Sequence, residues 1–406
     1  DVKLSAVQAC ILCKAEYPAD EVVYRCSSCG SLLEVRMILD DVNGRSMVEG
    51  WMGREKTIWR YRELIPVKAA AVTLKEGGTP LYEAEKAARW AGVKRILVKF
   101  EGLNPTGSFK DRGMSVGVTK AVELKKSIVV CASTGNTASS MAAYAAAAGL
   151  KPVVVIPRSG VAFGKLFQTI LHGAKTLQVS ESFDKALGMV LGSRLSAESY
   201  ILNSVNPWRI EGQKTLAFEL WEELKTTDYL VSIPVGNCGN ISALWKGFKE
   251  LHTLDLIRQF PRLIAVQAEG ASPFVDMVNR GDDKLIPVEN PSTIASAIRI
   301  GKPVNWMKAL KAVRESEGLA EKVSDELILE AQRVLASEVG IGVEPASAAS
   351  LAGVKRLAEK GMIDKNSTIV CIATGHALKD PNTEIISKQM YPDLMADEVS
   401  KLFAVR

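Results

Sequence analysis

The chain has 406 residues, of which 47% are hydrophobic and 24% are charged, and its formal net charge is +5. This length allows two or three domains with a sizeable core, and the composition is that of a soluble globular protein. Basic residues are interleaved with acidic ones, which argues against a nucleic-acid partner and is compatible with an anionic small molecule.

The sequence lacks the features of membrane and secreted proteins. A membrane helix needs roughly 18 uninterrupted apolar residues, and the nearest segment, 142–156, is broken by Gly149, Lys151 and Pro152. Residues 1–9 lack a basic segment followed by an apolar one, which argues against a signal peptide. We therefore expect a cytoplasmic protein with no membrane partner.

Four of the seven cysteines form the pairs Cys10-x-x-Cys13 and Cys26-x-x-Cys29. Two such pairs can place four thiolates around zinc, as in zinc ribbons, while disulfides or free thiols are the alternatives. Residues 1–36 contain few basic side chains, so we expect a structural metal module. The other cysteines lie in apolar runs and are expected to be buried: Cys131, Cys238 and Cys371.

Lys110 lies between a predicted strand, residues 95–100, and a predicted helix, Gly113 to Leu124. Near a helix N-terminus, Ser108 and Asp111 can cap free N–H groups, and the helix dipole disfavours a further positive charge. The pKa of the lysine is then lowered, and its amine can attack an aldehyde or carry a proton. From the local sequence alone, a surface lysine beside a cap is the simpler interpretation.

Two further segments indicate anion binding. The strand-like residues 128–132 precede the polar loop Ser133–Ser139 and an alanine-rich helix from Ser140. Residues 229–235 likewise precede the glycine-containing segment Gly236–Asn240 and a helix from Ile241. Backbone N–H groups at such helix starts can surround a carboxylate or phosphate, although a well-capped helix explains the first segment equally well.

Short strands alternate with helices through much of the chain. We predict strands at 152–157, 175–179, 263–268 and 368–373, with a helix at 165–171 between the first two. This alternation indicates βαβ units and parallel sheets. A peripheral helix is expected over 393–406.

The string Asn104-Pro105-Thr106-Gly107-Ser108-Phe109-Lys110-Asp111-Arg112 resembles the lysine segment of fold-type II enzymes that use pyridoxal phosphate (PLP), and most closely that of threonine synthases. The resemblance extends over roughly residues 50 to 390. It implies an α/β protein of PLP fold type II, with two domains that are each a mostly parallel sheet flanked by helices, after a small four-cysteine, zinc-ribbon-like module at residues 1–36. The implied large domain comprises 37–102 and 207–406, and the small domain 103–206.

The resemblance also implies roles for individual residues. Lys110 would bind the cofactor covalently and later move protons, Asn136 would hydrogen-bond the cofactor ring oxygen, and Thr374 the pyridine nitrogen. The cofactor phosphate would lie against Gly236, Asn237, Cys238, Gly239 and Asn240. The substrate carboxylate would be held by Ser133, Thr134 and Thr137, and the substrate phosphate by Ser204 and Arg209. Threonine synthases more often have alanine at the position of Cys238, which matters little where backbone amides bind.

The implied activity is that of a carbon–oxygen lyase converting O-phospho-L-homoserine and water to L-threonine and phosphate, the last step of threonine biosynthesis. A homodimer with PLP and structural Zn²⁺ is expected. The alternative within enzymes is a cysteate synthase, which uses phosphoserine and sulfite; a serine or threonine dehydratase would not need a second phosphate site. Outside enzymes, a zinc-ribbon binding protein that retains the fold is the alternative.

Overall fold

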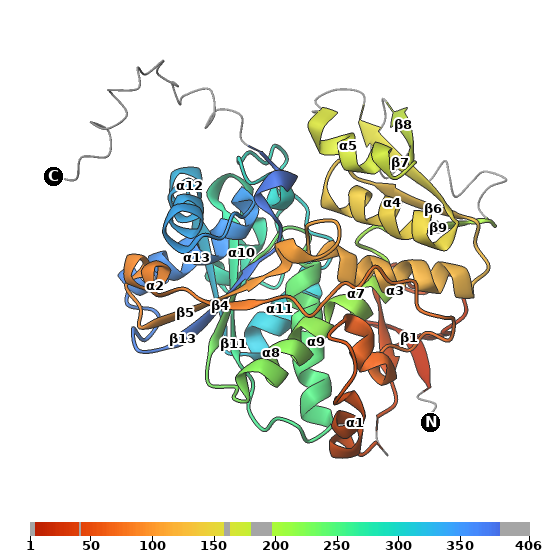
Figure 1. Cartoon of the computed structure of the whole chain (residues 1–406), viewed down its shortest axis with the longest axis horizontal. Coiled ribbons are helices and arrows are strands. Elements are labelled where there is room, and N and C mark those ends of the chain that lie inside the picture. Colours follow the sequence, from red (N-terminus) through yellow and green to blue (C-terminus); the bar gives the residue numbers. More distant parts are fainter. Residues whose placement is uncertain (1–4, 40–41, 158–162, 180–196, 382–406) are drawn as a thin grey trace, which may run out of the picture.

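The computed structural model describes residues 5–39, 42–157, 163–179 and 197–381. The helix predicted over 393–406 lies outside them. Two largely parallel sheets with flanking helices stand beside each other, and the N-terminal strands lie against their junction (Figure 1). The predicted fold class, an α/β protein with two such sheets, is confirmed.

The N-terminal module is a small antiparallel sheet with strand order β2-β1-β3. Its strands are β1 (Ala6–Cys10), β2 (Glu16–Pro18) and β3 (Leu33–Met37). The backbone N–H of Ile201 donates to the Tyr24 hydroxyl (2.8 Å), and Lys308 Nζ donates to the Leu33 carbonyl (2.7 Å). The module therefore contacts elements on both sides of the junction.

The larger sheet has the strand order β12-β11-β10-β13-β5-β4, and only the β4–β5 pair is antiparallel among its described pairs. The strands are β4 (Leu81–Glu83), β5 (Arg95–Phe100), β10 (Leu230–Pro234), β11 (Arg262–Ala268), β12 (Leu319–Val323) and β13 (Thr368–Ala373). The central strands are buried along nearly their whole length, as expected for parallel strands covered on both faces.

Helices cover both faces of this sheet (Figure 1). One face packs on α8 (Thr215–Leu224), α9 (Gly239–Thr253), α10 (Pro273–Arg280) and α11 (Trp306–Glu315). The opposite face packs on α2 (Glu85–Ala91), α12 (Asp325–Arg333) and α13 (Pro345–Glu359). The short α1 (Gly44–Trp51) places Trp51 in the first of these cores.

The smaller sheet is parallel, with strand order β8-β7-β6-β9. Its strands are β6 (Ile128–Ala132), β7 (Lys151–Pro157), β8 (Lys175–Val179) and β9 (Ser199–Ile201), and α3 (Lys110–Glu123), α4 (Asn136–Ala148) and α5 (Phe163–Leu171) belong to the same core. The strands predicted at residues 128–132, 152–157 and 175–179 are confirmed. Among the described residues, no helix is long and apolar enough to cross a membrane.

Close contact between α3 and α7 (Trp208–Gln213) joins the two sheets. A Cβ atom at Gly212 would lie 1.8 Å from the Arg112 carbonyl oxygen, and one at Gly113 would lie 2.9 Å from the Arg209 carbonyl oxygen. Only glycine permits such an approach of two helix backbones. The approach brings Lys110, at the start of α3, near Arg209 on α7.

Three helices begin earlier in the structure than the sequence pattern predicts. Helix α3 begins at Lys110 instead of Gly113, α4 at Asn136 instead of Ser140, and α9 at Gly239 instead of Ile241. Polar residues and glycines indicate loops in a local pattern. Here tertiary partners satisfy side chains of the first turn, as where Asn136 Nδ2 donates to Glu344 Oε2 (3.0 Å).

Candidate active site

A cavity lies where strands of the larger sheet end and α3, α4 and α7 approach them. Strands β5, β13 and β10 are parallel neighbours, so the segments leading to Lys110, Thr374 and Gly236 leave the sheet at one edge. The backbone N–H of Phe109 donates to the Thr374 carbonyl (3.0 Å), which fixes the lysine segment beside the end of β13.

The cavity collects most of the predicted site residues. It is lined by Lys110, Asn136, Ser204, Arg209, Gly236, Asn237, Cys238, Gly239, Asn240 and Thr374. Ser133, Thr134 and Thr137 are not among its lining residues; the Ser133 hydroxyl instead accepts from the Gly135 N–H (3.2 Å). The cavity volume is about 70 Å³.

Lys110 occupies the first turn of α3, half-buried at the cavity wall, with Nζ 4.5 Å from the centroid of the Phe109 ring. Burial, with a smaller contribution from the Arg209 charge, lowers the pKa of its amine to about 7. The predicted lowering is confirmed, but its main cause is desolvation. The Ser108 hydroxyl accepts from the Lys110 N–H (3.4 Å).

Asp111 does not cap the helix as predicted. Its carboxylate accepts from the N–H of Thr106 (2.6 Å) and from the hydroxyls of Thr106 (2.5 Å) and Ser140 (2.6 Å). Burial raises the pKa of this carboxyl group to about 6. Asp111 thus fixes the loop before α3 against α4, a role that spacing along the chain does not reveal.

Arg209 is a buried guanidinium in the wall of the same cavity, 3% exposed. Its Nη1 donates to the Leu202 carbonyl (3.1 Å), and its Nε has no partner. In the described part of the chain, no carboxylate lies within 4 Å of this group. Burial lowers the pKa of Arg209 to about 10. An uncompensated buried cation beside Ser204 is suited to an anionic ligand.

The segment Gly236–Asn240 curves into the N-terminus of α9. A Cβ atom at Gly236 would lie 3.0 Å from the Ala297 carbonyl oxygen and 3.2 Å from the Ile298 Cα, so a side chain does not fit there without displacement. Cys238 adopts a left-handed conformation (φ 64°) just before the helix begins, and Asn240 Nδ2 is buried without a partner. A glycine-bordered helix N-terminus with an unsatisfied donor fits a phosphate group.

Thr374 and Asn136 share a partner that the sequence does not identify as functional. Glu344, 2% exposed, accepts from Thr374 Oγ1 at Oε1 (3.2 Å) and from Asn136 Nδ2 at Oε2 (3.0 Å). The Thr374 hydroxyl also bonds the Ser347 hydroxyl (2.8 Å). Burial raises the pKa of Glu344. Glu344–Ala349 resembles a helix start that packs near the cofactor ring in related enzymes, but its spacing does not show that the Glu344 carboxylate lines the cavity.

Directly behind Lys110, Arg112 lies in a buried ion-pair network. Its guanidinium bonds Glu101 (2.6 Å from Nε) and Glu219 (2.6 Å from Nη1), and Lys99 also pairs with Glu219 (3.0 Å). These side chains are at most 5% exposed. The paired Arg112 and the unpaired Arg209 therefore differ in charge compensation although both are buried.

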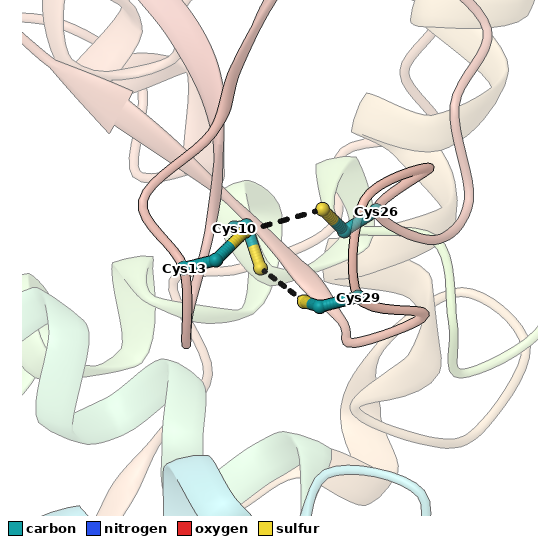
Figure 2. A group of neighbouring side chains, drawn as sticks. All are labelled: Cys10, Cys13, Cys26 and Cys29. Carbon is teal, nitrogen blue, oxygen red and sulfur yellow. Dashed lines mark hydrogen bonds between the residues drawn. The ribbon is translucent and has the colours of Figure 1, made fainter.

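The four N-terminal cysteines converge as predicted (Figure 2). Their Sγ atoms all lie within 4.8 Å of one another, with 3.4 Å for the Cys10–Cys29 and Cys13–Cys26 pairs. A zinc tetrahedron with ~2.3 Å bonds has sulfur–sulfur edges of about 3.8 Å. The geometry fits a tetrahedral ion, and all seven cysteines are free. Cys131, Cys238 and Cys371 are buried, as predicted.

The cavity residues fit PLP. Lys110 presents an amine that is half neutral near pH 7, Gly236–Asn240 offers donors for a phosphate, and the Thr374 hydroxyl lies at the end of β13. Asn240 Nδ2 and Arg209 Nε are buried donors without a partner. Each can therefore donate a hydrogen bond to an anionic group of a ligand.

Sequence and structure comparisons agree with this fit. Residues 72–375 match the family described as pyridoxal-phosphate dependent enzyme. The chain is 50% identical over 378 residues to the threonine synthase of Methanosarcina acetivorans, covering 93% of each chain. It is 50% identical over 383 residues to the threonine synthase of Methanocaldococcus jannaschii, covering 93% of this chain and 94% of the relative.

Among solved structures, a fungal L-serine ammonia-lyase from Rhizomucor miehei is similar with a TM-score of 0.66 and 22% identity, covering 79% of this chain and 100% of that one. The processed threonine deaminase isoform 2 from Solanum lycopersicum has a TM-score of 0.63 and 20% identity, covering 90% and 93%. At these identities the likeness supports the fold alone. Together with the family match and the curated relatives, it leads to one conclusion: the chain belongs to the pyridoxal-phosphate dependent enzymes and, within them, to the threonine synthase family.

Proposed function

We propose that this enzyme is a threonine synthase, a carbon–oxygen lyase that converts O-phospho-L-homoserine and water to L-threonine and phosphate. Relatives named threonine synthase that are 50% identical over most of the chain support this activity. The single structural observation that carries it is Arg209, a buried guanidinium without a carboxylate partner in the described part of the chain, in the cavity that holds Lys110.

The phosphate requirement separates this activity from others on the same fold. PLP brings one phosphate, which the Gly236–Asn240 segment suits. Arg209 and Ser204 form a second anion site in the same cavity, and a guanidinium can hold phosphate oxygens in a forked geometry. A substrate that carries its own phosphate, and releases it, uses both sites. A dehydratase of serine or threonine would leave the second one unused.

The chain's residues would divide the work as follows. PLP, when bound, supplies an electron sink for the carbanion chemistry. Lys110 would carry the cofactor and, once displaced, take the substrate α-proton at Nζ, and a pKa near 7 suits that exchange. Arg209 and Ser204 would hold the leaving phosphate, and Thr374 would offer a neutral hydroxyl to the ring nitrogen.

Other residues would position these groups. Asn136 would contact the cofactor ring oxygen, in reach of Glu344, and Ser133, Thr134 and Thr137 would bind the substrate carboxylate. Closure of the cavity would exclude bulk water until water adds at the β-carbon. Catalysis would then take place in a cavity shielded from bulk water.

We also propose that Cys10, Cys13, Cys26 and Cys29 hold a structural Zn²⁺. The Tyr17 hydroxyl donates a hydrogen bond to Cys26 Sγ (3.3 Å), and hydrogen bonds of this kind orient metal ligands. The division into a large domain (37–102 and 207–406) and a small domain (103–206), and the homodimer, remain predictions.

Phosphate release assays test the activity. The PLP-loaded protein should release phosphate from phosphohomoserine with formation of threonine, and its visible absorbance should change when that substrate is added. Release from phosphoserine only in the presence of sulfite would instead identify a cysteate synthase. A purified protein that does not turn yellow with PLP would favour a non-enzymatic zinc-ribbon protein.

A further inference from the structure

A second cavity, with a volume of about 250 Å³, lies between the N-terminal module and the helices of the larger sheet. Its wall combines Ile11, Leu12, Lys14 and Glu34 of the module with residues of α7, α9 and α11. Ile210 of α7, which follows Arg209, lines both this cavity and the catalytic one. The two cavities are therefore neighbours that share one side chain.

The lining of the second cavity is strongly cationic. Five lysines face a single carboxylate, Glu34: Lys14, Lys246, Lys249, Lys308 and Lys311. Carboxylates outside the lining compensate three of them. Lys246 pairs with Glu211 and Glu250, and the Glu315 carboxylate lies 3.7 Å from Lys249 and 3.6 Å from Lys311.

Lys14 and Lys308 are different. Within the described residues, no carboxylate lies within 4 Å of either ammonium group, and each donates instead to a backbone carbonyl, of Ile11 (3.1 Å) and Leu33 (2.7 Å). Burial lowers the pKa of Lys308 to about 8, although the Glu34 charge opposes this shift; the neighbouring Lys246 charge acts in the same direction as burial. An anion in the cavity would raise the pKa of Lys308 again because it stabilises the charged amine.

An apolar surface lies beside these charges. Trp245 is 3% exposed, with its Nε1 donating to Glu315 Oε2 (2.7 Å), and Met307 and Ile11 continue the wall. Leu12 is 59% exposed at the same wall. A ligand that satisfies the whole lining has an anionic end and an apolar body.

We propose that this second cavity binds a phosphate-bearing small molecule with an apolar body, of the class of nucleoside phosphates, as an effector of the catalytic cavity. Ammonium groups act as point charges for phosphate and need no fixed planar geometry. Several of them around one cavity suit a ligand with more than one phosphate.

The helices that form this cavity also form the catalytic one. Helix α9 begins in the Gly236–Asn240 segment and carries Lys246 about two turns and Lys249 nearly three turns later. Helix α11 begins directly after Asn305, whose Nδ2 donates to the Ser204 carbonyl (3.0 Å) and whose N–H donates to the Asn237 carbonyl (3.0 Å). A ligand that draws these helices toward the module therefore acts on both proposed phosphate sites.

Calorimetric titration of PLP-loaded protein with ATP tests the binding. Lys308→Met should weaken ATP binding at least tenfold, whereas Lys284→Met, which removes an exposed lysine outside the lining, should leave it unchanged. Inorganic triphosphate should bind more weakly than ATP because it lacks the apolar body. Absence of binding at millimolar ATP, or equal affinity in the Lys308→Met and unaltered proteins, overturns the proposal.

A second variant tests the same cavity independently, in case Lys308→Met impairs folding. Lys249→Met changes a partly exposed lining side chain on α9 and should also weaken ATP binding severalfold, with an unchanged melting temperature. Because coupling between sites is reciprocal, the affinity for ATP should differ between the PLP-free and PLP-loaded proteins. Equal affinity in both forms would refute the effector role. These measurements do not depend on which amino acid the enzyme makes.

Discussion

The guanidinium of Arg209 lies near enough to Lys110 to lower the pKa of the lysine amine. Both side chains line one cavity, and burial lowers the pKa of each. The carboxylate of Glu344 acts in the opposite direction on Lys110, but it is itself bonded to Asn136 and Thr374. Two cations held together in this way are better stabilised when anionic ligands enter the cavity than when none is present.

Replacing Arg209 should raise the stability of the PLP-free protein and weaken its interaction with substrate. Arg209→Met removes a buried charge without a carboxylate partner, so the PLP-free protein should gain about 1–3 kcal/mol in free energy of unfolding. The same change should raise KM for phosphohomoserine about 10- to 100-fold, because a charge-assisted hydrogen bond contributes ~1.5–3 kcal/mol. Denaturant titration and steady-state kinetics measure both effects. PLP affinity should change much less.

Arg112→Met is the matched comparison, a buried arginine that does have partners. Its removal leaves Glu101 and Glu219 buried without their guanidinium, which should cost about 3–5 kcal/mol. If both variants are destabilised alike, Arg209 has a compensating group, and the second phosphate site lies elsewhere.

Lys110→Ala should abolish covalent PLP attachment and lower kcat by at least ~10³-fold, since it removes both the attachment point and a proton carrier. Visible absorbance of the purified protein reports the attachment. Lys110→Arg keeps a positive charge but cannot bond the aldehyde, so it should behave like alanine. Full activity in either variant would rule out the role assigned to this lysine.

The pKa of Lys110 predicts how PLP capture depends on pH. With a pKa of about 7, about 10% of the amine is neutral at pH 6 and about 90% at pH 8. The rate of attachment to the PLP-free protein should therefore rise through this interval and level off above pH 8. Stopped-flow absorbance measures it. A rate that continues to rise toward pH 10 would indicate an ordinary lysine pKa.

The lowered pKa of Lys110 also predicts that the stability of the PLP-free protein depends on pH. Between about pH 7 and the usual value of 10.5, the unfolded chain binds more protons at this lysine than the folded one, so the stability of the PLP-free protein rises with pH. Lys110→Met should flatten that dependence within this window. Chemical denaturation of the two proteins at pH 7 and pH 9 makes the comparison.

Glu344→Ala should weaken PLP binding about tenfold, because Asn136 and Thr374 lose the carboxylate that orients them. Glu344→Gln keeps one acceptor oxygen and should lose less. PLP dissociation constants from fluorescence titration distinguish the two variants. An alanine variant with unchanged PLP affinity would show that neither side chain depends on Glu344.

Cys26→Ser should remove bound Zn²⁺ and lower the melting temperature, because the module that contacts Ile201 and Lys308 loses its cross-link. Elemental analysis and thermal denaturation measure the two effects. Cys371→Ala, which changes a buried cysteine far from this cluster in the sequence, should retain the metal. Purified protein that contains no zinc and melts identically in both variants would exclude a structural metal.

Local sequence patterns fix the elements because they depend on neighbours along the chain. The apolar strands 95–100, 128–132 and 368–373, the Cys-x-x-Cys pairs and the glycine segment at 236–240 were all found in this way. The resemblance of the lysine segment added the family, which the comparisons confirm.

Only the tertiary structure decided which charges face each other. Arg112 and Arg209 are both buried, yet one meets two carboxylates and the other meets none within the described residues. Glu344 and the second cavity likewise depend on segments that are far apart in the sequence. Burial and nearby charges set the pKa of Lys110, and both arise from contacts between segments that are distant in the sequence. They therefore cannot be predicted from periodicity and spacing along the chain.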